Sequence, residues 1–393
     1  MKVALIHDWL TGMRGGEKCL EIFCSLYPDA DIFTLIHNKG TVSECIEKMN
    51  INTSFIQKFP FLNKYRRYLP LFPSAIEQFD LNEYDLVLSS SHCVAKGVIT
   101  GPETLHICYC HTPMRYVWDM YNSYFGKGNA GLLSRCAIPF FANYLRSWDV
   151  SSSMRVEYFI ANSHYVAKRI KKFYNRNAKV IHPPVDCSVF EIQKNTEDFY
   201  LVVSAFAPYK RVDLAIKAFN KLELPLVVIG SGQDEKKLKQ IAKKNITFLG
   251  WQADKVIRDY YAKCKALIFP GKEDFGIVPL EVQSCGRPVI AYGVGGVCET
   301  VIPINSRIKN DTHLQKNTTG HGLNEQQYAT GIFFYEQTVD AVINSVREYE
   351  EVKDRFDSAI IRTHALTFDK PIFKTRIKNH IDHCVNEHND RIF

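Results

Sequence analysis

The sequence lacks several features that would place it in large classes of protein. Among its 393 residues, no apolar run is long enough to span a membrane. The first ten residues, MKVALIHDWL, lack the build of a signal peptide and are typical of a first β-strand. Long basic tracts are also absent, although the formal net charge is +7. This mild positive charge suits an anionic ligand or an anionic membrane face, and we expect no nucleic-acid partner.

Cysteine pairs with CxxC spacing are absent as well. The twelve cysteines are scattered along the chain, so we expect a reducing compartment, which is the cytoplasm. The one cluster that suggests a metal reads CYCH, from Cys108 to His111. It lies at the end of a predicted strand and has no second pair of ligands, so we predict that it binds no zinc.

The chain does contain a regular alternation of short apolar runs and amphipathic stretches. Strands are predicted for the apolar runs at 2–7, 30–35, 85–90, 105–110, 158–163, 178–182, 199–206, 225–230, 246–250, 266–270 and 288–292. Helices are predicted for the amphipathic stretches at 16–27, 164–174, 210–222, 235–244 and 254–264. Such alternation predicts an α/β fold, with parallel sheets covered by helices on both faces.

A domain boundary is predicted at Pro183–Pro184, which interrupts the alternation before a polar stretch. The chain is too long for one ordinary core, so we predict two doubly wound domains, residues 1–186 and 187–367. Ligands bind such sheets at the carboxyl ends of the strands, so the cleft between the domains is the expected active site. Residues 304–329 are polar and aperiodic, and we expect a mobile surface loop there.

Several segments occur in an order that is known from one enzyme family. They read GMRGGEK, CHTPMRYVWD, VIHPPVD, PYKRVDLAIKAF, FLGW, PGKEDFGIVPLEVQSCGRPVIAY and GGVCETV. In these segments the chain resembles the retaining, nucleotide-sugar-dependent glycosyltransferases of family 4. This family has the GT-B fold, in which two Rossmann-like domains face a central cleft. The pieces HTPMRYVWD and PYKR resemble the subgroup that includes mannosyltransferases of O-antigen and polysaccharide assembly. The resemblance also implies that a C-terminal helix, about 368–393, packs back on the first domain.

The pair Glu273 and Glu281, separated by seven residues, matches the signature of this family. The resemblance implies that Glu273 lies by the donor sugar and that Glu281 binds the ribose hydroxyls. A carboxylate suits a vicinal diol because it accepts hydrogen bonds from both hydroxyls. If Glu273 precedes a helix and Glu281 lies on its second turn, both can face one cleft. The alternative interpretation is a helix cap and an exposed helix residue.

A diphosphate leaving group requires cations and backbone N–H groups. Gly15 and Gly16 follow the first strand and open a helix, where a phosphate can approach the backbone closely. Lys210 and Arg211 open another helix, a position that disfavours cations unless an anionic ligand is present. The family commonly has an arginine about five positions before this lysine, where this chain has Ala205. The division of the phosphate role between Lys210 and Arg211 is therefore open.

Further contacts with the donor follow from the resemblance and from the helix start after Glu273. The expected contacts are Phe275, Gly276, Ile277 and Val278 at this helix start, and Gly250 and Trp251 near the nucleotide base.

His111 ends a predicted strand, at the carboxyl edge of the first sheet. The resemblance implies a contact with the donor sugar near its reacting carbon. The neutral imidazole could bind a hydroxyl or accept the acceptor's proton, and the alternative is a structural histidine. The catalytic candidates are thus His111, Glu273 and Lys210. Arg115, Trp118 and Asp119 are candidates for the acceptor side.

Two other patterns are rejected and one remains open. Asp29–Asp31 reads as a turn before a strand rather than a metal site, and Ile229–Gly232 is too short for a dinucleotide fingerprint. Residues 55–72 interleave aromatic side chains with lysine and arginine. This segment suits a membrane interface, a cleft for a phosphorylated acceptor, or a packed helical excursion.

The predicted reaction is the retaining transfer of a sugar from a nucleoside diphosphate sugar, with GDP-mannose as the best candidate. The acceptor would be a hydroxyl of a saccharide or of a lipid-linked saccharide in cell-surface polysaccharide synthesis, at the cytoplasmic face of the membrane. No metal or other cofactor would be needed. Two alternatives stay open. A nucleotide-sugar epimerase of the same fold would need no acceptor, and a catalytically silent saccharide-binding protein would show no turnover.

Overall fold

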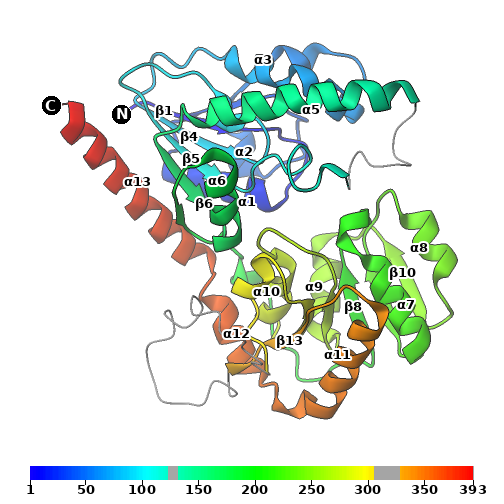
Figure 1. The fold of residues 1–393 in the computed structure, drawn as a ribbon. Helices are drawn as coiled ribbons and strands as arrows, with labels where there is room; N and C mark the ends of the chain where they lie inside the picture. The colour runs from blue at the N-terminus through cyan, green and yellow to red at the C-terminus, as the bar shows by residue number, and fades with distance from the viewer. Residues whose placement is uncertain (123–131, 305–327, 393) are drawn as a thin grey trace. The chain divides into compact units, whose positions relative to one another are not determined.

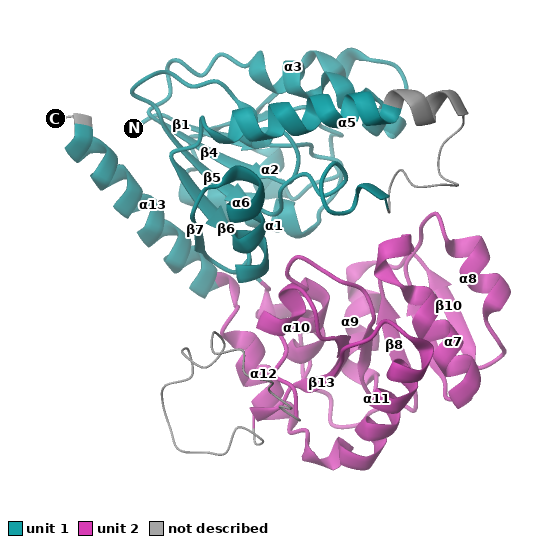
Figure 2. Ribbon diagram, in the orientation of Figure 1, with its two compact units in different colours: residues 1–184, 371–393 teal, residues 185–370 magenta. Residues whose placement is uncertain are grey.

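The computed structural model describes residues 1–122, 132–304 and 328–392. The chain forms two compact units (Figure 2). Unit 1 comprises Met1–Pro184 and Pro371–Phe393, and unit 2 comprises Val185–Lys370. The first boundary between the two units lies directly after Pro183–Pro184, the pair at which the sequence predicts a domain boundary. Most of the loop predicted for residues 304–329 lies outside the described residues.

Unit 1 is built on a seven-stranded parallel sheet with the order β3-β2-β1-β4-β5-β6-β7. Its strands are β1 Val3–His7, β2 Asp31–Thr34, β3 Asn50–Thr53, β4 Leu86–Ser91, β5 Leu105–Cys110, β6 Tyr158–Ala161 and β7 Ala178–Val180. Every residue of β1, β4 and β5 is buried. Strands that are buried on both faces are expected in a parallel sheet with helices on each side. The polar edge strand β3 has no apolar signal, and sequence reasoning missed it.

Helices cover both faces of this sheet (Figure 1). They are α1 Gly15–Leu26, α2 Glu44–Glu47, α3 Phe72–Glu77, α5 Leu132–Ser153, α6 His164–Tyr174 and α13 Lys370–Ile392. Phe23 of α1 and Phe373 of α13 lie in the core on one face, and Phe72 of α3 and Trp148 of α5 lie in the core on the other. Helix α13 therefore belongs to unit 1, where the resemblance places the C-terminal helix.

Unit 2 repeats this architecture on a six-stranded parallel sheet with the order β10-β9-β8-β11-β12-β13. Its strands are β8 Tyr200–Val203, β9 Leu226–Ile229, β10 Ile246–Gly250, β11 Leu267–Phe269, β12 Val289–Tyr292 and β13 Gly331–Phe334. Its helices are α7 Val212–Leu222, α8 Glu235–Ile241, α9 Asp254–Lys263, α10 Ile277–Ser284, α11 Val339–Val352 and α12 Ser358–Leu366. The predicted α/β class, with two doubly wound parallel sheets, is confirmed.

The strand order reverses once in each sheet. In unit 1 the reversal lies between β1 and β4, and in unit 2 it lies between β8 and β11. At such a switch point, the loops at the carboxyl ends of the two strands diverge to opposite faces and leave a crevice for ligands. The loops that follow these four strands are therefore the expected positions of a ligand site.

The basic and aromatic segment 55–72 forms two 3₁₀ turns, Phe55–Lys58 and Leu62–Leu71, followed by α3. Tyr65 is buried, and its ring lies 5.2 Å from the ring of Trp9. Phe61 is exposed and has a left-handed backbone conformation. Part of the segment therefore packs on unit 1, while its basic side chains Lys58, Lys64, Arg66 and Arg67 are exposed.

Candidate active site

Lys210 and Glu273 meet at the switch point of unit 2. Lys210 lies in the loop after β8, and Glu273 lies in the loop after β11. The Lys210 ammonium donates a hydrogen bond to Glu273 Oε1 and forms an ion pair with it. The two side chains are 20% and 13% exposed, respectively. A cation and a carboxylate thus lie together, within reach of a ligand, at the edge where a doubly wound sheet binds ligands.

Glycines allow the loops of this site to approach one another. A Cβ atom on Gly271 would lie 3.0 Å from both Cα and the carbonyl oxygen of Lys210. Gly295 has a φ of +96°, and a Cβ there would lie 2.5 Å from the carbonyl oxygen of Glu273. The Gly296 N–H donates to that same oxygen at 2.9 Å. Because larger residues would push these loops apart, the glycines determine where Lys210 and Glu273 meet.

Helix α10 begins directly after this loop. Gly276, with a φ of +101°, is its N-cap, and Ile277 and Val278 form the start of its first turn. First-turn N–H groups have no partner within their own helix, so they are available to an anion. The Phe275 side chain is buried in the core, with its ring 6.0 Å from that of Phe368. A contribution of Phe275 to ligand binding would therefore come from its main chain.

Glu281 lies on the second turn of α10, as the spacing predicts. Its Oε2 accepts a hydrogen bond of 3.0 Å from the Tyr261 hydroxyl on α9. Burial, together with the Glu281 charge, raises the pKa of Tyr261 well above its ordinary value. The tyrosine therefore stays a hydrogen-bond donor and holds the carboxylate in one orientation. Glu281 is thus joined to α9, whereas Glu273 is joined to Lys210.

Arg211 differs from its neighbour Lys210. The sequence predicts that both residues open a helix, but α7 begins at Val212, and Arg211 is its N-cap in a left-handed conformation. Its Nε lies 3.0 Å from Asp213 Oδ1. Burial alone would raise the pKa of Asp213, but the hydrogen bonds from Arg211 and Lys217 lower it. The guanidinium is thus held by a carboxylate of its own helix.

Gly250 and Trp251 lie at the carboxyl end of β10. Gly250 has a φ of +69°, and Trp251 is 75% exposed. The indole is therefore accessible to a ligand.

In unit 1, His111 follows β5 and lies close to the first turn of α1. Its Nε2 is 2.9 Å from Ser90 Oγ at the end of β4. A Cβ atom on Gly16 would lie 3.6 Å from this nitrogen and 3.3 Å from Cε1 of His7. The structure therefore brings Gly15 and Gly16 together with His111. Burial, followed by the neighbouring His92 and His7, lowers the pKa of His111 to about 3, so this imidazole is neutral at pH 7.

Sequence reasoning missed four polar residues at this edge, namely His7, Asp8, Glu17 and His92. His7 ends β1, Asp8 follows it, and His92 follows β4, so all three lie at the switch point. His7 and Glu17 are buried and lie 3.7 Å apart. The signal that could have identified His7, Asp8 and His92 is the appearance of ionisable residues where two buried strands end, in the stretches LIHDW and SSSHC.

The residues considered for the acceptor side have structural partners. Trp118 Nε1 donates to Asp149 Oδ2 at 2.8 Å, and the indole stacks on Phe173. Asp119 pairs with Arg169 at 2.5 Å.

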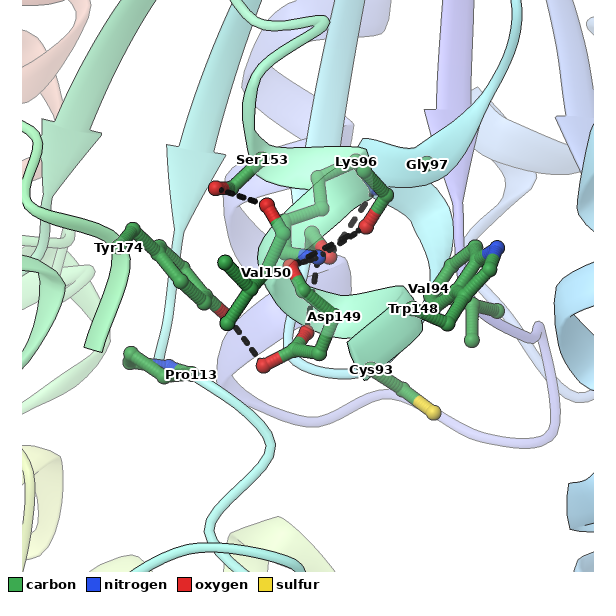
Figure 3. A network of polar contacts seen from close by, with 12 residues as sticks. Cys93, Val94, Lys96, Gly97, Pro113, Trp148, Asp149, Val150, Ser153 and Tyr174 are labelled. Atoms are coloured by element: carbon green, nitrogen blue, oxygen red, sulfur yellow. Dashed lines mark hydrogen bonds and ion pairs between the residues drawn. The ribbon is translucent and has the colours of Figure 1, made fainter. Parts of the chain in front are cut away.

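Asp149 is the centre of a buried network on the α5 side of the sheet. Lys96 lies 2.8 Å from its Oδ1, and the Tyr174 hydroxyl donates to its Oδ2 at 2.9 Å. In Figure 3, dashed lines join Asp149 both to Lys96 and to Tyr174. The network connects the loop after β4 with α5, α6 and, through Trp118, the segment after His111.

The two sequence patterns that we rejected as metal sites, Cys108–His111 and Asp29–Asp31, contain side chains that are buried in a strand or hydrogen-bonded to neighbouring residues. Cys108 and Cys110 are buried in β5, and Asp31 accepts hydrogen bonds from Asn50 and Tyr84. Within residues 1–122, 132–304 and 328–392, no cluster of three or more histidine, cysteine or acidic side chains is arranged to hold a metal ion. None of the helices described in those ranges is both long and apolar enough to cross a membrane.

Comparison with known proteins connects these observations to one enzyme family. The model of Glycosyltransferase Family 4 matches residues 29–189, and the model of Glycosyl transferases group 1 matches residues 188–316. The chain is 28% identical over 372 residues to the alpha-1,3/1,6-mannosyltransferase of Saccharomyces cerevisiae, covering 76% of this chain and 71% of that protein. It is 32% identical over 148 residues to an uncharacterized glycosyltransferase of Methanocaldococcus jannaschii, covering 36% of this chain and 42% of that protein.

Solved structures share the whole architecture. HepE of Anabaena, crystallised with UDP and glucose, superposes with a TM-score of 0.66 at 17% identity and covers 97% of this chain and 99% of its own. Sucrose-phosphate synthase of Thermosynechococcus elongatus superposes with a TM-score of 0.68 at 14% identity, covering 98% and 99%. At these identities the likeness establishes the fold, which is GT-B. The family models, the relatives and the fold agree, and the chain belongs to the family 4 glycosyltransferases.

Proposed function

We propose that this enzyme transfers a sugar, with retention of anomeric configuration, from a nucleoside diphosphate sugar to a hydroxyl of a saccharide acceptor. The observation that carries the proposal is the Lys210–Glu273 pair at the switch point of unit 2. The diphosphate is a dianionic leaving group that Lys210 would bind in place of Glu273. The released carboxylate would then face the donor sugar, where it stabilises positive charge that develops at the anomeric carbon.

The start of α10 would supply N–H groups for the phosphates. Glu281, held by Tyr261, would accept from the ribose hydroxyls. Between the two cations of the PYKR motif, we assign the phosphate to Lys210, because it lies at the switch point beside Glu273, whereas Arg211 caps α7 and pairs with Asp213 of the same helix. With charge neutralised by Lys210 and these N–H groups, the reaction would need no metal ion.

Mannose is the proposed sugar and GDP-mannose the proposed donor. The relatives include the yeast mannosyltransferase and an O-antigen chain mannosyltransferase of Escherichia coli, which is 24% identical over 225 residues. The proposed acceptor is a saccharide or lipid-linked saccharide of cell-surface polysaccharide synthesis. The reaction would take place in the cytoplasm, at the inner face of the membrane, where the exposed basic side chains of residues 58–67 suit anionic lipid.

A panel of nucleoside diphosphate sugars tests this proposal. The purified enzyme is incubated with each donor, with and without saccharide acceptors, and the release of nucleoside diphosphate is measured. We expect acceptor-dependent release with GDP-mannose and an α-linked product by NMR. Interconversion of donors without an acceptor would instead indicate an epimerase. Binding in a thermal-shift assay without turnover would indicate a saccharide-binding protein.

A further inference from the structure

Unit 1 presents one large aromatic side chain to solvent in a strained backbone conformation. Phe61 is 71% exposed, and its φ of +57° and ψ of +43° lie in the left-handed region. This region is unfavourable for a residue with a Cβ atom, and a bulky residue there is a genuine outlier. Glycine or asparagine would fit this turn better. Such outliers are common where a residue contacts a ligand or partner, so the exposed ring requires an explanation.

The turn that contains Phe61 is fixed by its own neighbours. The Phe61 carbonyl accepts from the Lys64 N–H at 2.8 Å. The Tyr68 hydroxyl donates to the Pro60 carbonyl at 2.5 Å, and its ring packs edge-on against Phe59, with centroids 5.1 Å apart. Further along, Tyr65 is buried against the core of unit 1. The exposed position of Phe61 is therefore built into the fold of the segment.

Positive charge follows and precedes Phe61 without compensating acid. Between Glu47 and Glu77 the sequence contains no aspartate or glutamate. The exposed cations of the segment are Lys58, Lys64, Arg66 and Arg67. Within the described parts of the chain, no ion pair joins any of the four to an acidic side chain. The segment thus carries a local excess of four positive charges, which attracts an anionic surface.

Helix α8 of unit 2 shows how an ordinary solvated basic face differs from this segment. It exposes Lys236, Lys237 and Lys239. Lys239 pairs with Glu235 at 2.8 Å, and the apolar Leu238 is buried. The helix contains no aromatic residue. Residues 58–71 differ in both respects, because their cations are not paired with carboxylates and apolar side chains lie exposed among them.

We propose that the surface of residues 58–71 docks unit 1 on an anionic lipid bilayer, with the Phe61 ring inserted at the headgroup boundary. The cations contact lipid phosphates, and the exposed Leu71 adds apolar area at the other end of the segment. Lipid fits better than a dissolved anion, because only a bilayer buries an aromatic ring beside phosphates. The inference deepens the proposed function, on which it rests for a lipid-linked acceptor, and it assigns the inserted side chain.

Vesicle sedimentation with the full chain, without donor or acceptor, tests the proposal. We expect binding to vesicles of phosphatidylcholine with phosphatidylglycerol, weaker binding as salt increases, and none to phosphatidylcholine alone. Arg66→Gln with Arg67→Gln should weaken binding about 25-fold, since each cation near an anionic bilayer contributes about fivefold. Lys236→Gln with Lys237→Gln removes the same charge from α8 and is the matched control, which should bind as wild type.

Phe61→Asn tests the inserted ring separately from the charges. Asparagine tolerates the left-handed conformation, so the variant should fold at least as well as wild type. Its vesicle binding should fall about tenfold, because the apolar ring is lost. In Phe61→Trp, brominated phosphatidylglycerol should quench the added indole on binding, beyond the quenching of the four native tryptophans.

Several results would overturn the proposal. They are equal binding to neutral and anionic vesicles, an equal loss in the α8 control, unchanged binding by Phe61→Asn, or no added quenching in Phe61→Trp. Binding to RNA without binding to vesicles would also reject it. If the double arginine variant fails to fold, the two Phe61 variants still decide. Failure of the proposed function is distinguishable, because an enzyme that binds vesicles but releases no nucleoside diphosphate contradicts that function alone.

Discussion

Each unit contains a lysine–carboxylate pair whose lysine lies in a loop after a strand, and the two pairs differ in burial. Lys96 and Asp149 of unit 1 are 2% and 0% exposed, whereas Lys210 and Glu273 of unit 2 are 20% and 13% exposed. The buried pair is also fully surrounded. Lys96 donates to Ser152 and to the Asp149 carbonyl, and Asp149 accepts from Tyr174 and Trp118.

The difference shows how a lysine–carboxylate pair can stabilise the fold in one place and be available for ligand binding in another. A buried pair enclosed by other side chains leaves no room for a ligand, and separating its charges is costly. A partly exposed pair gains less from its attraction, so an anionic ligand can replace one partner. Lys96–Asp149 therefore holds α5 on unit 1, and Lys210–Glu273 is the pair that, under the proposed function, a nucleotide sugar opens.

The largest expected effect is on the stability of unit 1. Asp149→Ala leaves the Lys96 ammonium buried without its counter-charge, so the free energy of unfolding should fall by about 3–5 kcal/mol. Urea denaturation followed by circular dichroism measures this change. The double variant Lys96→Met with Asp149→Leu should be less destabilised than the single variant, because no charge remains in the interior. A loss below about 1 kcal/mol for Asp149→Ala would contradict the structural role.

The corresponding change in unit 2 should affect catalysis instead. Lys210→Met keeps the apolar stem and removes the charge that, under the proposed function, faces the diphosphate. We expect turnover to fall by about 10²–10³-fold and the free energy of unfolding to change by less than about 1 kcal/mol. Lys217→Met, at an exposed lysine of α7, is the matched control. Unchanged turnover and donor affinity in Lys210→Met would show that the phosphates bind elsewhere.

Donor affinity should also depend on Glu281. Under the proposed function, Glu281→Ala removes charged hydrogen bonds to the ribose, which are worth about 1.5–3 kcal/mol each, and calorimetric titration with the donor measures the loss. Tyr261→Phe keeps the carboxylate and removes only its orienting hydroxyl, so its effect should be smaller, about 1 kcal/mol. A donor affinity that is the same in Glu281→Ala and wild type would mean that Glu281 serves only to join α10 to α9.

The same contrast between buried and accessible groups predicts which unit is more sensitive to acid. In unit 1, burial lowers the pKa of His106 and His111 to about 3. The unfolded chain binds these protons from about pH 6.5 downward and the folded unit does not. Stability is therefore complete above this pH and falls by up to about 1.4 kcal/mol per pH unit for each histidine as the pH decreases.

In unit 2, Glu350 provides the comparison. Burial would raise its pKa, but hydrogen bonds from Lys265, Tyr200 and Lys353 lower it to about 2. Its stabilising contribution is therefore present above about pH 4.5 and is lost only below that value. His364 of unit 2 also has a lowered pKa, so unit 2 also loses some stability as the pH decreases. Hydrogen exchange between pH 7 and 5 should show unit 1 losing protection faster, and the reverse order would contradict the greater acid sensitivity of unit 1.

Local chemistry explains where sequence reasoning succeeded. The helix predicted for residues 164–174 is α6, His164–Tyr174. Ser163 caps its start by accepting from the Val166 N–H, and Asn175 ends it in a left-handed conformation. The helix predicted from Lys210 starts two positions later, because Arg211 takes a left-handed conformation that its sequence neighbours do not predict. The loop residue Gly271, distant in the chain, packs against the backbone of Lys210 directly before that turn.

The candidate site was predictable only in part, because some of its contacts join residues that are far apart in the chain. Lys210, Glu273, Glu281 and His111 lie in recognisable motifs. Asp8 and His92 lie in no motif, and they are joined by contacts between residues 84 positions apart in the chain. Periodicity and spacing describe neighbours within a few turns, so such a contact is invisible until the strand order is known.

The sequence by itself determined that two parallel sheets form, because buried strands and amphipathic helices each carry their pattern in adjacent residues. It also determined which motif residues lie at strand and helix ends. Only the tertiary structure decided which of those ends meet, and how deeply each charge is buried. Burial depends on side chains that arrive from distant parts of the chain, and it is burial that separates a structural lysine–aspartate pair from one that a ligand can open.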